Sequence, residues 1–313
     1  KAILGLRVEN YIQRHTGRDQ QYASGDDVNG RNLDNEKVLE SLDLFPSVNL
    51  IYALAEKQNL RLSWSRTIAR PSFKELSFAQ ILDPISNRIF NGSLFTYNDW
   101  DGKLSETRIG NTDLRWELFL NNNQVFSVSG FYKAFSDPIE LVRIPEQQTS
   151  TEYQPRNVGD GDLYGLGLEF RKDFDFISPA WKNLNISGNL TLVESSIEMT
   201  EAEFESRQTF ERSGEEVTRT RAMAGQSPYV INAGIGYSNY KAGIDAGLFY
   251  HTKGSTLYIV GMGLFPDIYI EPFHSLNFSL IKKLGEEHQT TIDLKISNIL
   301  NEKTVNVYRS FGT

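Results

Sequence analysis

The chain of 313 residues contains no cysteine and only 4 histidines. The lack of cysteine excludes a disulfide framework and thiolate metal sites. His15, His251, His274 and His288 are scattered without the spacing of metal ligands, so we expect no metal site. An excess of positive charge is also missing, because the net charge is -8, and this argues against a nucleic-acid partner.

No apolar run approaches the roughly 18 residues that a membrane-spanning helix needs. The mean hydropathy is -0.40. A membrane β-barrel is compatible with both observations, because its strands show only an alternation of apolar and polar residues. No Ser/His/Asp arrangement and no pair of facing carboxylates stands out, so we expect neither enzymatic activity nor a cofactor.

Segments in which apolar and polar residues alternate are frequent in the chain, and residues 60–68 show this pattern most clearly. Apolar residues fall on one face of this segment and polar residues on the other, as the two-residue repeat of a strand requires. The apolar face consists of Leu60, Leu62, Trp64 and Ile68. Arg66 interrupts this face near the end of the segment, where a long side chain can reach water. Pro71 has no backbone N–H to donate, so it predicts the end of the strand and the start of a loop.

Similar segments recur along the chain and predict about eleven strands. The predicted strands cover residues 4–13, 44–55, 60–68, 113–120, 124–135, 157–172, 184–193, 229–237, 242–251, 273–284 and 290–297. The polar segments between them are predicted as loops, and the most prominent are residues 14–43, 71–112 and 194–221.

The predicted connections alternate between short and long. Short turns fall at EKQN (56–59), NNN (121–123), SNYK (238–241) and GEEH (285–288), with a modest turn at 174–183. This asymmetry is typical of outer-membrane barrels, whose periplasmic turns are short and whose extracellular loops are long. We therefore expect the segment 60–70 to run outward. An open half-sheet would leave unpaired edges in lipid, so we expect the native protein to include more chain.

Four stretches resemble one family. SRTIARPSFKEL (65–76) and GNTDLRWE (110–117) are similar to a strand followed by Arg-Pro-Ser and to a Gly-Asn-x-x-Leu strand start in the TonB-dependent receptors of the bacterial outer membrane. NVGDGDLYGLGLEF, which begins at Asn157, and DLKISNILNEK, which begins at Asp293, resemble the same family. The matching stretches are spread over most of the chain.

The resemblance implies an all-β fold, a transmembrane antiparallel β-barrel. Residues 1–313 would form a fragment of the outer-membrane barrel domain, with about eleven strands out of roughly 22, and the plug domain and the last strand would lie outside this chain. It also implies energy-dependent uptake of a scarce, bulky solute such as a ferric siderophore, a cobalamin, a peptide or a glycan. The implied partners are outer-membrane lipid and the TonB energising complex, which would be contacted through the missing N-terminal part, and a surface lipoprotein is left open.

Two other interpretations stay open. A barrel could serve as an adhesion or secretion scaffold that binds a partner protein, and the sequence upstream of Lys1 would distinguish this from transport, because only a transporter needs a plug. A soluble β-sandwich or carbohydrate-binding module would instead need its apolar strand faces packed against one another.

Recognition residues are expected in the loops, because lumen-facing strand residues are largely covered by a plug and lipid-facing ones meet acyl chains. In the loop 71–112, Tyr97 and Trp100, together with Phe95, offer flat aromatic area. Arg88 and Arg108 in the same loop offer hydrogen-bond donors.

A second group of candidates lies in the charged segment 194–221. Such a segment is usually a solvated loop, and the alternative is a charged ligand surface that includes Arg219 and Arg221. The acidic pairs at 99 and 101 and at 160 and 162 are better explained by solvated turns than by a calcium site.

Overall fold

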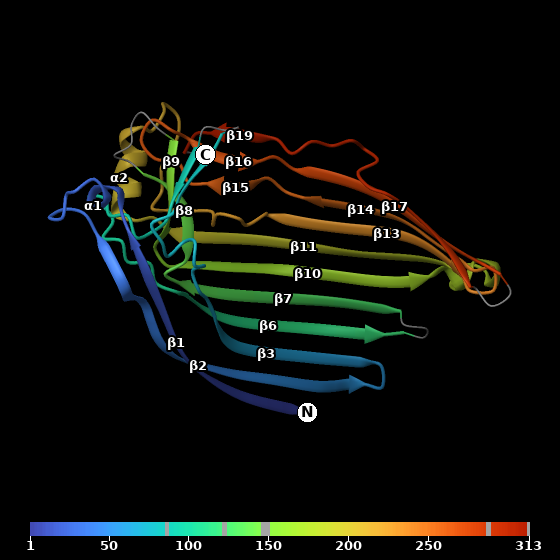
Figure 1. The fold of residues 1–313 in the computed structure, drawn as a ribbon. Helices are drawn as coiled ribbons and strands as arrows, with labels where there is room; N and C mark the ends of the chain where they lie inside the picture. The colour runs from blue at the N-terminus through green and yellow to red at the C-terminus, as the bar shows by residue number, and fades with distance from the viewer. Residues whose placement is uncertain (85–87, 121–123, 145–150, 286–288, 312–313) are drawn as a thin grey trace.

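Eleven strands pair in chain order into one curved antiparallel sheet (Figure 1). The computed structural model describes residues 1–84, 88–120, 124–144, 151–285 and 289–311. Across the sheet the strands are β1 (Ala2–Arg18), β2 (Asn32–Ala55), β3 (Gln58–Ala69), β6 (Thr107–Phe119), β7 (Val125–Ser136), β10 (Gly161–Asp173), β11 (Leu184–Glu198), β13 (Tyr229–Asn239), β14 (Ile244–Lys253), β17 (Phe273–Leu284) and β18 (Thr290–Ile296). The short β12 (Thr220–Arg221) pairs with β11. The predicted all-β barrel wall is confirmed, as a partial and unclosed barrel whose edge strands are β1 and β18.

The outer face of this sheet is apolar and exposed. One row of residues that pair across six neighbouring strands consists of Leu50, Leu62, Leu114, Gly130, Leu166 and Leu192. Leu62 is 43% exposed and Leu166 is 61% exposed. A continuous exposed band of this kind is what a barrel wall presents to lipid.

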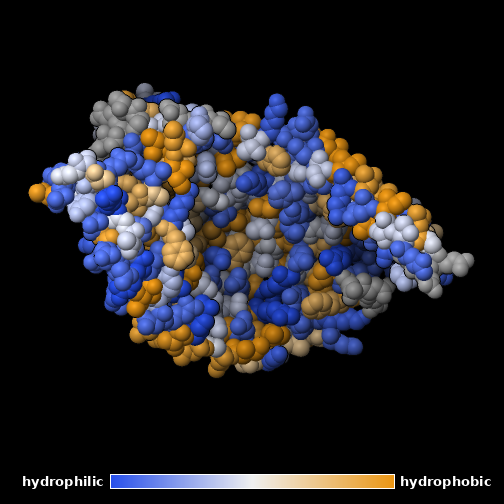
Figure 2. Space-filling model, viewed as in Figure 1, coloured by the Kyte–Doolittle hydropathy of each residue, from blue (hydrophilic) through white to orange (hydrophobic). Residues whose placement is uncertain are grey.

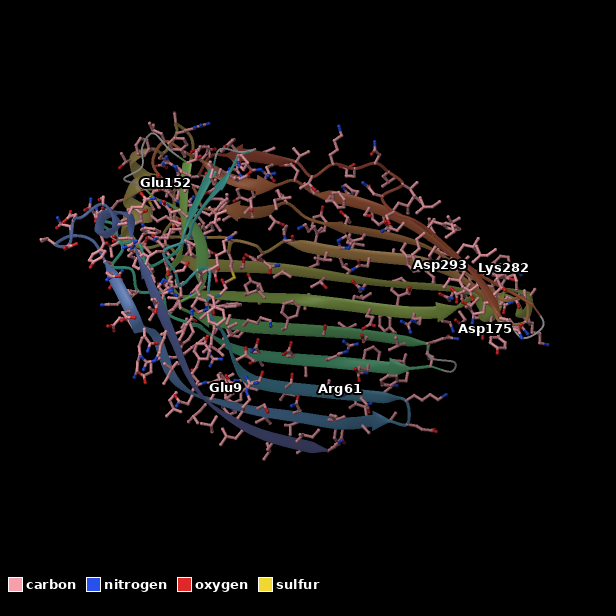
Figure 3. All side chains as sticks on the ribbon, viewed as in Figure 1. Glu9, Arg61, Glu152, Asp175, Lys282 and Asp293 are labelled. Carbon is pink, nitrogen blue, oxygen red and sulfur yellow. The ribbon has the colours of Figure 1, made fainter. Side chains whose placement is uncertain are left out.

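The inner face is polar, and Figure 2 looks into the hollow that it lines. Arg61 on β3, labelled in Figure 3, bonds Glu117 on β6 at 2.6 Å. Arg115 also contacts Glu117, at 3.1 Å, and reaches Glu169 on β10 at 2.7 Å. These paired charges come from β3, β6 and β10, and the contact with β10 crosses the intervening β7. The inner wall is thus lined by groups that require water or polar partners.

The two ends of the sheet differ, as the alternating connections predict. Short turns join β2 to β3, β13 to β14, and β10 to β11, where the turn holds η1 (Phe174–Phe176) and η2 (Pro179–Trp181). The predicted turn 121–123 and residues 286–288 lie outside the described residues. Figure 3 marks both ends, with Asp175 in a short turn and Glu152 among the long connections.

The first long connection is shorter than the sequence predicts. β1 continues to Arg18 and β2 begins at Asn32, so only residues 19–31, which include α1 (Gln20–Ala23), connect them. The pairing shifts register between Gln13 and Arg14 and again between His15 and Gly17. Past the apolar band both faces of a strand meet polar surroundings, so the alternation on which the prediction depends disappears while backbone pairing continues.

The other long connections fold into a second layer of strands. β4 (Gln80–Asp83), β5 (Arg88–Asn91), β9 (Thr151–Asn157) and β8 (Ile139–Arg143) pair in that order, and β5 and β9 are parallel. β15 (Thr256–Ile259), β16 (Asp267–Ile270) and β19 (Asn306–Arg309) form a three-stranded sheet. A parallel bridge from Val142 to Val260 joins the two sheets. We call these seven strands the loop layer.

The loop layer lies at the end of the wall that carries the long connections, with β8 and β9 running across the direction of the wall strands (Figure 1). The predicted loop 71–112 is therefore partly ordered into β4 and β5, and β6 already begins at Thr107. The connection between β11 and β13 contains α2 (Glu201–Thr209). Neither helix in the part of the chain that the structure describes is long and apolar enough to cross a membrane.

Candidate functional site

Buried apolar side chains hold the loop layer together. One cluster combines Leu76, Leu94 and Leu104 with Leu39 from β2. A second joins Tyr153 on β9 to β15 and β16 through Ile259 and Ile268. A third packs the loop layer on the wall, and it contains Val142, Val158, Ile197 and Met262. Because such packed clusters resist deformation, the loop layer is a rigid platform rather than a set of independent loops.

The two predicted aromatic residues, Tyr97 and Trp100, are brought together in a tight hairpin. The Tyr97 N–H donates to the Trp100 carbonyl at 2.8 Å, and the Trp100 N–H donates back to Tyr97 at 3.0 Å. The indole Nε1 of Trp100 donates to the Ser93 carbonyl at 2.7 Å. Both side chains are half-buried, so part of each remains exposed to solvent.

Arg156 on β9 fills the space beneath this hairpin. Its guanidinium carbon lies 5.7 Å from the ring centroid of Tyr97 and 5.5 Å from that of Trp100. Its Nη1 bonds Asp99 Oδ2 at 2.7 Å, and its Nε donates to Gln154 Oε1 at 3.0 Å. A cation held against aromatic faces contributes about 0.5–2 kcal/mol. Arg156 therefore sets the position of both aromatic side chains.

Arg156 and Gln154, which support this hairpin, are not among the residues that the sequence pattern predicts. Gln154 Nε2 donates to the carbonyls of Gly92 and Phe95, both at 2.9 Å, so it fixes the chain that leads to the hairpin. The only local signal is that two polar residues flank Pro155 at alternate positions. Their partners lie about 60 residues away in the sequence, and local composition does not encode such a distance.

A buried ionic cluster connects three of the long connections. Arg207 and Glu203 on α2 bond at 2.9 Å, and Arg207 also bonds Asp267 on β16 at 2.8 Å. Arg221 bonds Glu203 at 2.6 Å and Glu140 on β8 at 2.8 Å. Burial alone disfavours a charged Arg221, but the charges and hydrogen bonds of Glu140 and Glu203 outweigh it and raise the pKa of Arg221 above its usual range. Arg221 therefore stays charged, and the cluster ties α2, β8 and β16 together.

The segment 194–221 is thus only partly the solvated loop that its composition suggests. The side chains of Arg207 and Arg221 are 1% and 7% exposed, because carboxylates from distant segments neutralise them. Arg219 does lie at the surface, where it bonds Glu201 at 2.8 Å and its guanidinium carbon lies 4.3 Å from the Phe204 ring centroid. Of this pair of candidates, Arg219 faces solvent and Arg221 supports the loop layer.

The remaining candidates, Arg88 and Arg108, lie apart from each other. Arg88 is the first residue of β5 and is half-buried. Burial raises the pKa of the nearby Tyr153 hydroxyl, and the charge of Arg88 opposes this shift. Arg108 belongs to β6, is 65% exposed, and lies 3.6 Å from Asp43 Oδ1 and from Glu106 Oε1. It pairs in register with Ile68, which places it on the outer face of the wall.

A hollow of about 270 Å³ opens between β5, β8 and the chain that follows Pro71. Phe90, Leu141 and Pro155 supply apolar walls, and Lys74 and Glu75 are charged lining residues. Asn91, which also lines this hollow, donates to Glu152 at 2.7 Å, while its buried Oδ1 accepts no hydrogen bond. The described residues contain no group of three or more His, Asp or Glu side chains placed to hold a metal ion. The hollow therefore suits a ligand with an apolar part and a hydrogen-bond donor.

Known receptors share this architecture. The copper transporter OprC superposes with a TM-score of 0.64 at 14% identity, over 100% of this chain and 41% of that chain. The ferric-catecholate import receptor Fiu from E. coli superposes with a TM-score of 0.55 at 12% identity, over 96% of this chain and 38% of that chain. The ferric enterobactin receptor PfeA from Pseudomonas aeruginosa superposes with a TM-score of 0.51 at 16% identity, over 83% of this chain and 35% of that chain. The chain thus spans about two fifths or less of the length of these proteins.

Sequence comparison identifies the family directly. A comparison with curated protein sequences finds no significant match. The family model described as "TonB dependent receptor-like, beta-barrel" matches residues 1–299, nearly the whole chain. Together with the lipid-facing apolar band and the polar inner wall, this match shows that the chain belongs to the TonB-dependent receptor family and forms part of an outer-membrane β-barrel.

Proposed function

We propose that the chain is about half of the barrel wall of a TonB-dependent transporter that takes up a scarce, bulky solute. The packed loop layer is the observation that carries this proposal. It presents aromatic, cationic and hydrogen-bonding groups on a rigid support at the extracellular end of a polar-lined wall. Loops held on a rigid scaffold are where binding residues concentrate.

The rest of the barrel must come from outside this chain. β1 and β18 are edges, and unpaired backbone groups in lipid cost several kcal/mol each. We infer that residues 1–313 are one part of a barrel domain whose remaining strands, including a last inward strand, close the wall. A plug domain in the lumen and its contact with the TonB complex belong to the same missing part.

The proposed solute is a ferric siderophore or a similar metal chelate. The neighbouring structures named above are a copper transporter and receptors for ferric enterobactin and ferric catecholates. Tyr97 and Trp100 would supply flat contact area, and Arg88 and Arg219 would supply cationic donors for an anionic chelate. Arg221 and Arg156 would act by positioning, and the exposed Arg108 faces away from this surface.

Solute binding and uptake by whole cells test the proposal, each measured with the proton gradient intact and after its collapse. Uptake should require the gradient, and initial binding should not. The double variant Tyr97→Ala with Trp100→Ala should weaken binding at least about tenfold, roughly 1.4 kcal/mol, with unchanged barrel insertion. Lys103→Gln, an exposed change in the same loop, should bind like the parent.

The two parts of the proposal fail separately. Uptake that continues without the gradient would contradict active transport. If the double variant binds like the parent while uptake still needs the gradient, transport stands and the recognition surface lies elsewhere in the loop layer.

A further inference from the structure

The outer face of the wall contains two exposed arginines close to the apolar band. The band ends in a row of residues paired in register across four strands, namely Trp64, Thr112, Tyr132 and Tyr164. The Tyr132 hydroxyl donates to Asp162, which lies further toward the long connections. Aromatic rings with polar tips directed away from an apolar band mark the membrane–water interface of barrels.

Arg66 lies in the next row toward the extracellular side. It pairs in register with Gly110, which pairs with Ala134. A step of two residues along a strand is about 7 Å, so Arg66 stands at the level of lipid headgroups. Arg108 follows one row further out, on the same face as Arg66. The two guanidinium groups therefore come from adjacent strands on the side of the wall that meets lipid.

A groove of about 520 Å³ lies between these arginines and the hairpin of β1 and β2. It exists because β2 pairs with β3 only as far as Ser47 and Ser65, and beyond this point β2 pairs with β1 alone. Pro46, which has no backbone N–H, stands where the β2–β3 pairing ends. The wall therefore splits at its extracellular end and leaves an opening toward lipid.

The groove combines an apolar wall, a flat floor and a cationic edge. Leu42 is 72% exposed and Leu44 is 58% exposed along the β2 side. The floor includes Gly110 and Ala134, and a Cβ added at Gly110 would meet no atom within 4 Å. Arg66 and Arg108 line the opposite side. An apolar surface beside two guanidinium groups is complementary to an acyl chain beside a phosphate.

The surrounding charges leave this groove positive. Glu9 bonds Arg70 at 2.7 Å and Arg7 at 3.0 Å, and Asp43 lies between Arg70 and Arg108 at 3.8 and 3.6 Å. Glu106 is 3.6 Å from Arg108. Arg66 and Arg108 are the cations among the residues that line the groove, and Asp43 is the carboxylate among them. Arg7 and Glu9 pair in register with Phe45 and Asp43 on the inner face of the wall, and among the described residues Arg66 has no ion-pair partner.

We propose that this groove binds a phosphate-bearing, acylated lipid of the outer leaflet, with Arg66 and Arg108 on the phosphate and Leu42 and Leu44 along an acyl chain. The site is separate from the solute-binding surface and does not depend on the transport proposal. A lipid bound there would cover the opening that the split between β2 and β3 leaves in the wall.

The test measures lipid binding to the full-length, delipidated protein by native mass spectrometry, with diphosphorylated lipid A as the probe. The double variant Arg66→Gln with Arg108→Gln should bind this lipid at least about tenfold more weakly than the parent. Gly110→Leu, which fills the floor without changing charge, should also weaken binding. Lys103→Gln with Arg212→Gln removes the same charge from the exposed loops and should bind like the parent.

Two further arms identify the ligand chemistry. Dephosphorylated lipid A should bind the parent and the double variant with the same weak affinity, and inorganic phosphate should not displace the intact lipid. If the parent and the double variant bind diphosphorylated lipid equally, or if inorganic phosphate alone competes, the lipid site is overturned. Arg66→Lys keeps the charge but loses the forked donor, so a folded Arg66→Lys variant should show intermediate binding even where the double variant does not fold.

Discussion

The guanidinium of Arg156 lies 5.5 Å from the ring centroid of Trp100, and its Nη1 bonds Asp99 in the same hairpin at 2.7 Å. One buried arginine thus determines the geometry of the aromatic pair that we assign to solute recognition. The relationship couples β9 to a hairpin about 57 residues earlier in the chain. A change beneath the binding surface should therefore act on recognition without any direct contact with the solute.

Replacement of Arg156 by Leu should loosen the hairpin of Tyr97 and Trp100. The variant leaves the Asp99 carboxylate without its cation, at a cost of about 1–3 kcal/mol to the local structure. Hydrogen exchange at residues 93–101 should become faster, and solute binding should weaken about tenfold. Lys103→Gln is the matched exposed control and should change neither. Unchanged exchange in the Leu variant would show that the hairpin holds its shape without Arg156.

The buried ionic cluster should respond far more strongly to mutation than the surface pair beside it. Arg207→Met removes the cation between Glu203 and Asp267 and should destabilise the loop layer by about 3–5 kcal/mol, because the buried Asp267 loses its cation and Glu203 keeps only Arg221. Glu201→Gln breaks only the exposed pair with Arg219 and should have no measurable effect. Limited proteolysis of the α2 connection measures both, and equal sensitivity of the two variants would contradict the cluster's role.

The wall could be predicted from the sequence because lipid on one side and water on the other impose the alternation on every spanning strand. Leu62 and Leu114 are on the outer face as their positions in the alternation require. Past the lipid this constraint ends, which explains why β2 extends from residue 44 back to Asn32 without any signal.

The loop layer could not be predicted, because the pairings that join its local hairpins to other strands are distant in sequence and are not set by solvent. β5 pairs in parallel with β9 about 63 residues later, and no local pattern specifies that register. The aromatic candidates were found from residue type alone, whereas Arg156 and Arg207 have their roles only through partners that the fold brings to them.

The orientation of the wall can be tested with matched variants on β3. Leu62→Arg near the middle of the apolar band should cost about 2–4 kcal/mol, because charged side chains are penalised on the lipid face. Ser63→Arg should cost little, since Ser63 faces the inner side, where its hydroxyl lies 3.4 Å from Asp113 Oδ2. Folding of the full-length protein into liposomes measures both. Equal losses of folding free energy in the two variants would contradict the assignment of the lipid-facing and inner faces.

The topology gives the last prediction, because it assigns every long connection to the cell exterior and every short turn to the periplasm. Val28 lies in the connection between β1 and β2 and is 91% exposed, and Tyr240 lies in the turn between β13 and β14 and is 81% exposed. The chain has no cysteine, so Val28→Cys and Tyr240→Cys each introduce one thiol, once any cysteine elsewhere in the full-length protein is replaced. An impermeant thiol reagent applied to intact cells should label position 28 and spare position 240, and permeabilised cells should be labelled at both. Labelling of position 240 and not of position 28 in intact cells would contradict the direction assigned to the strands.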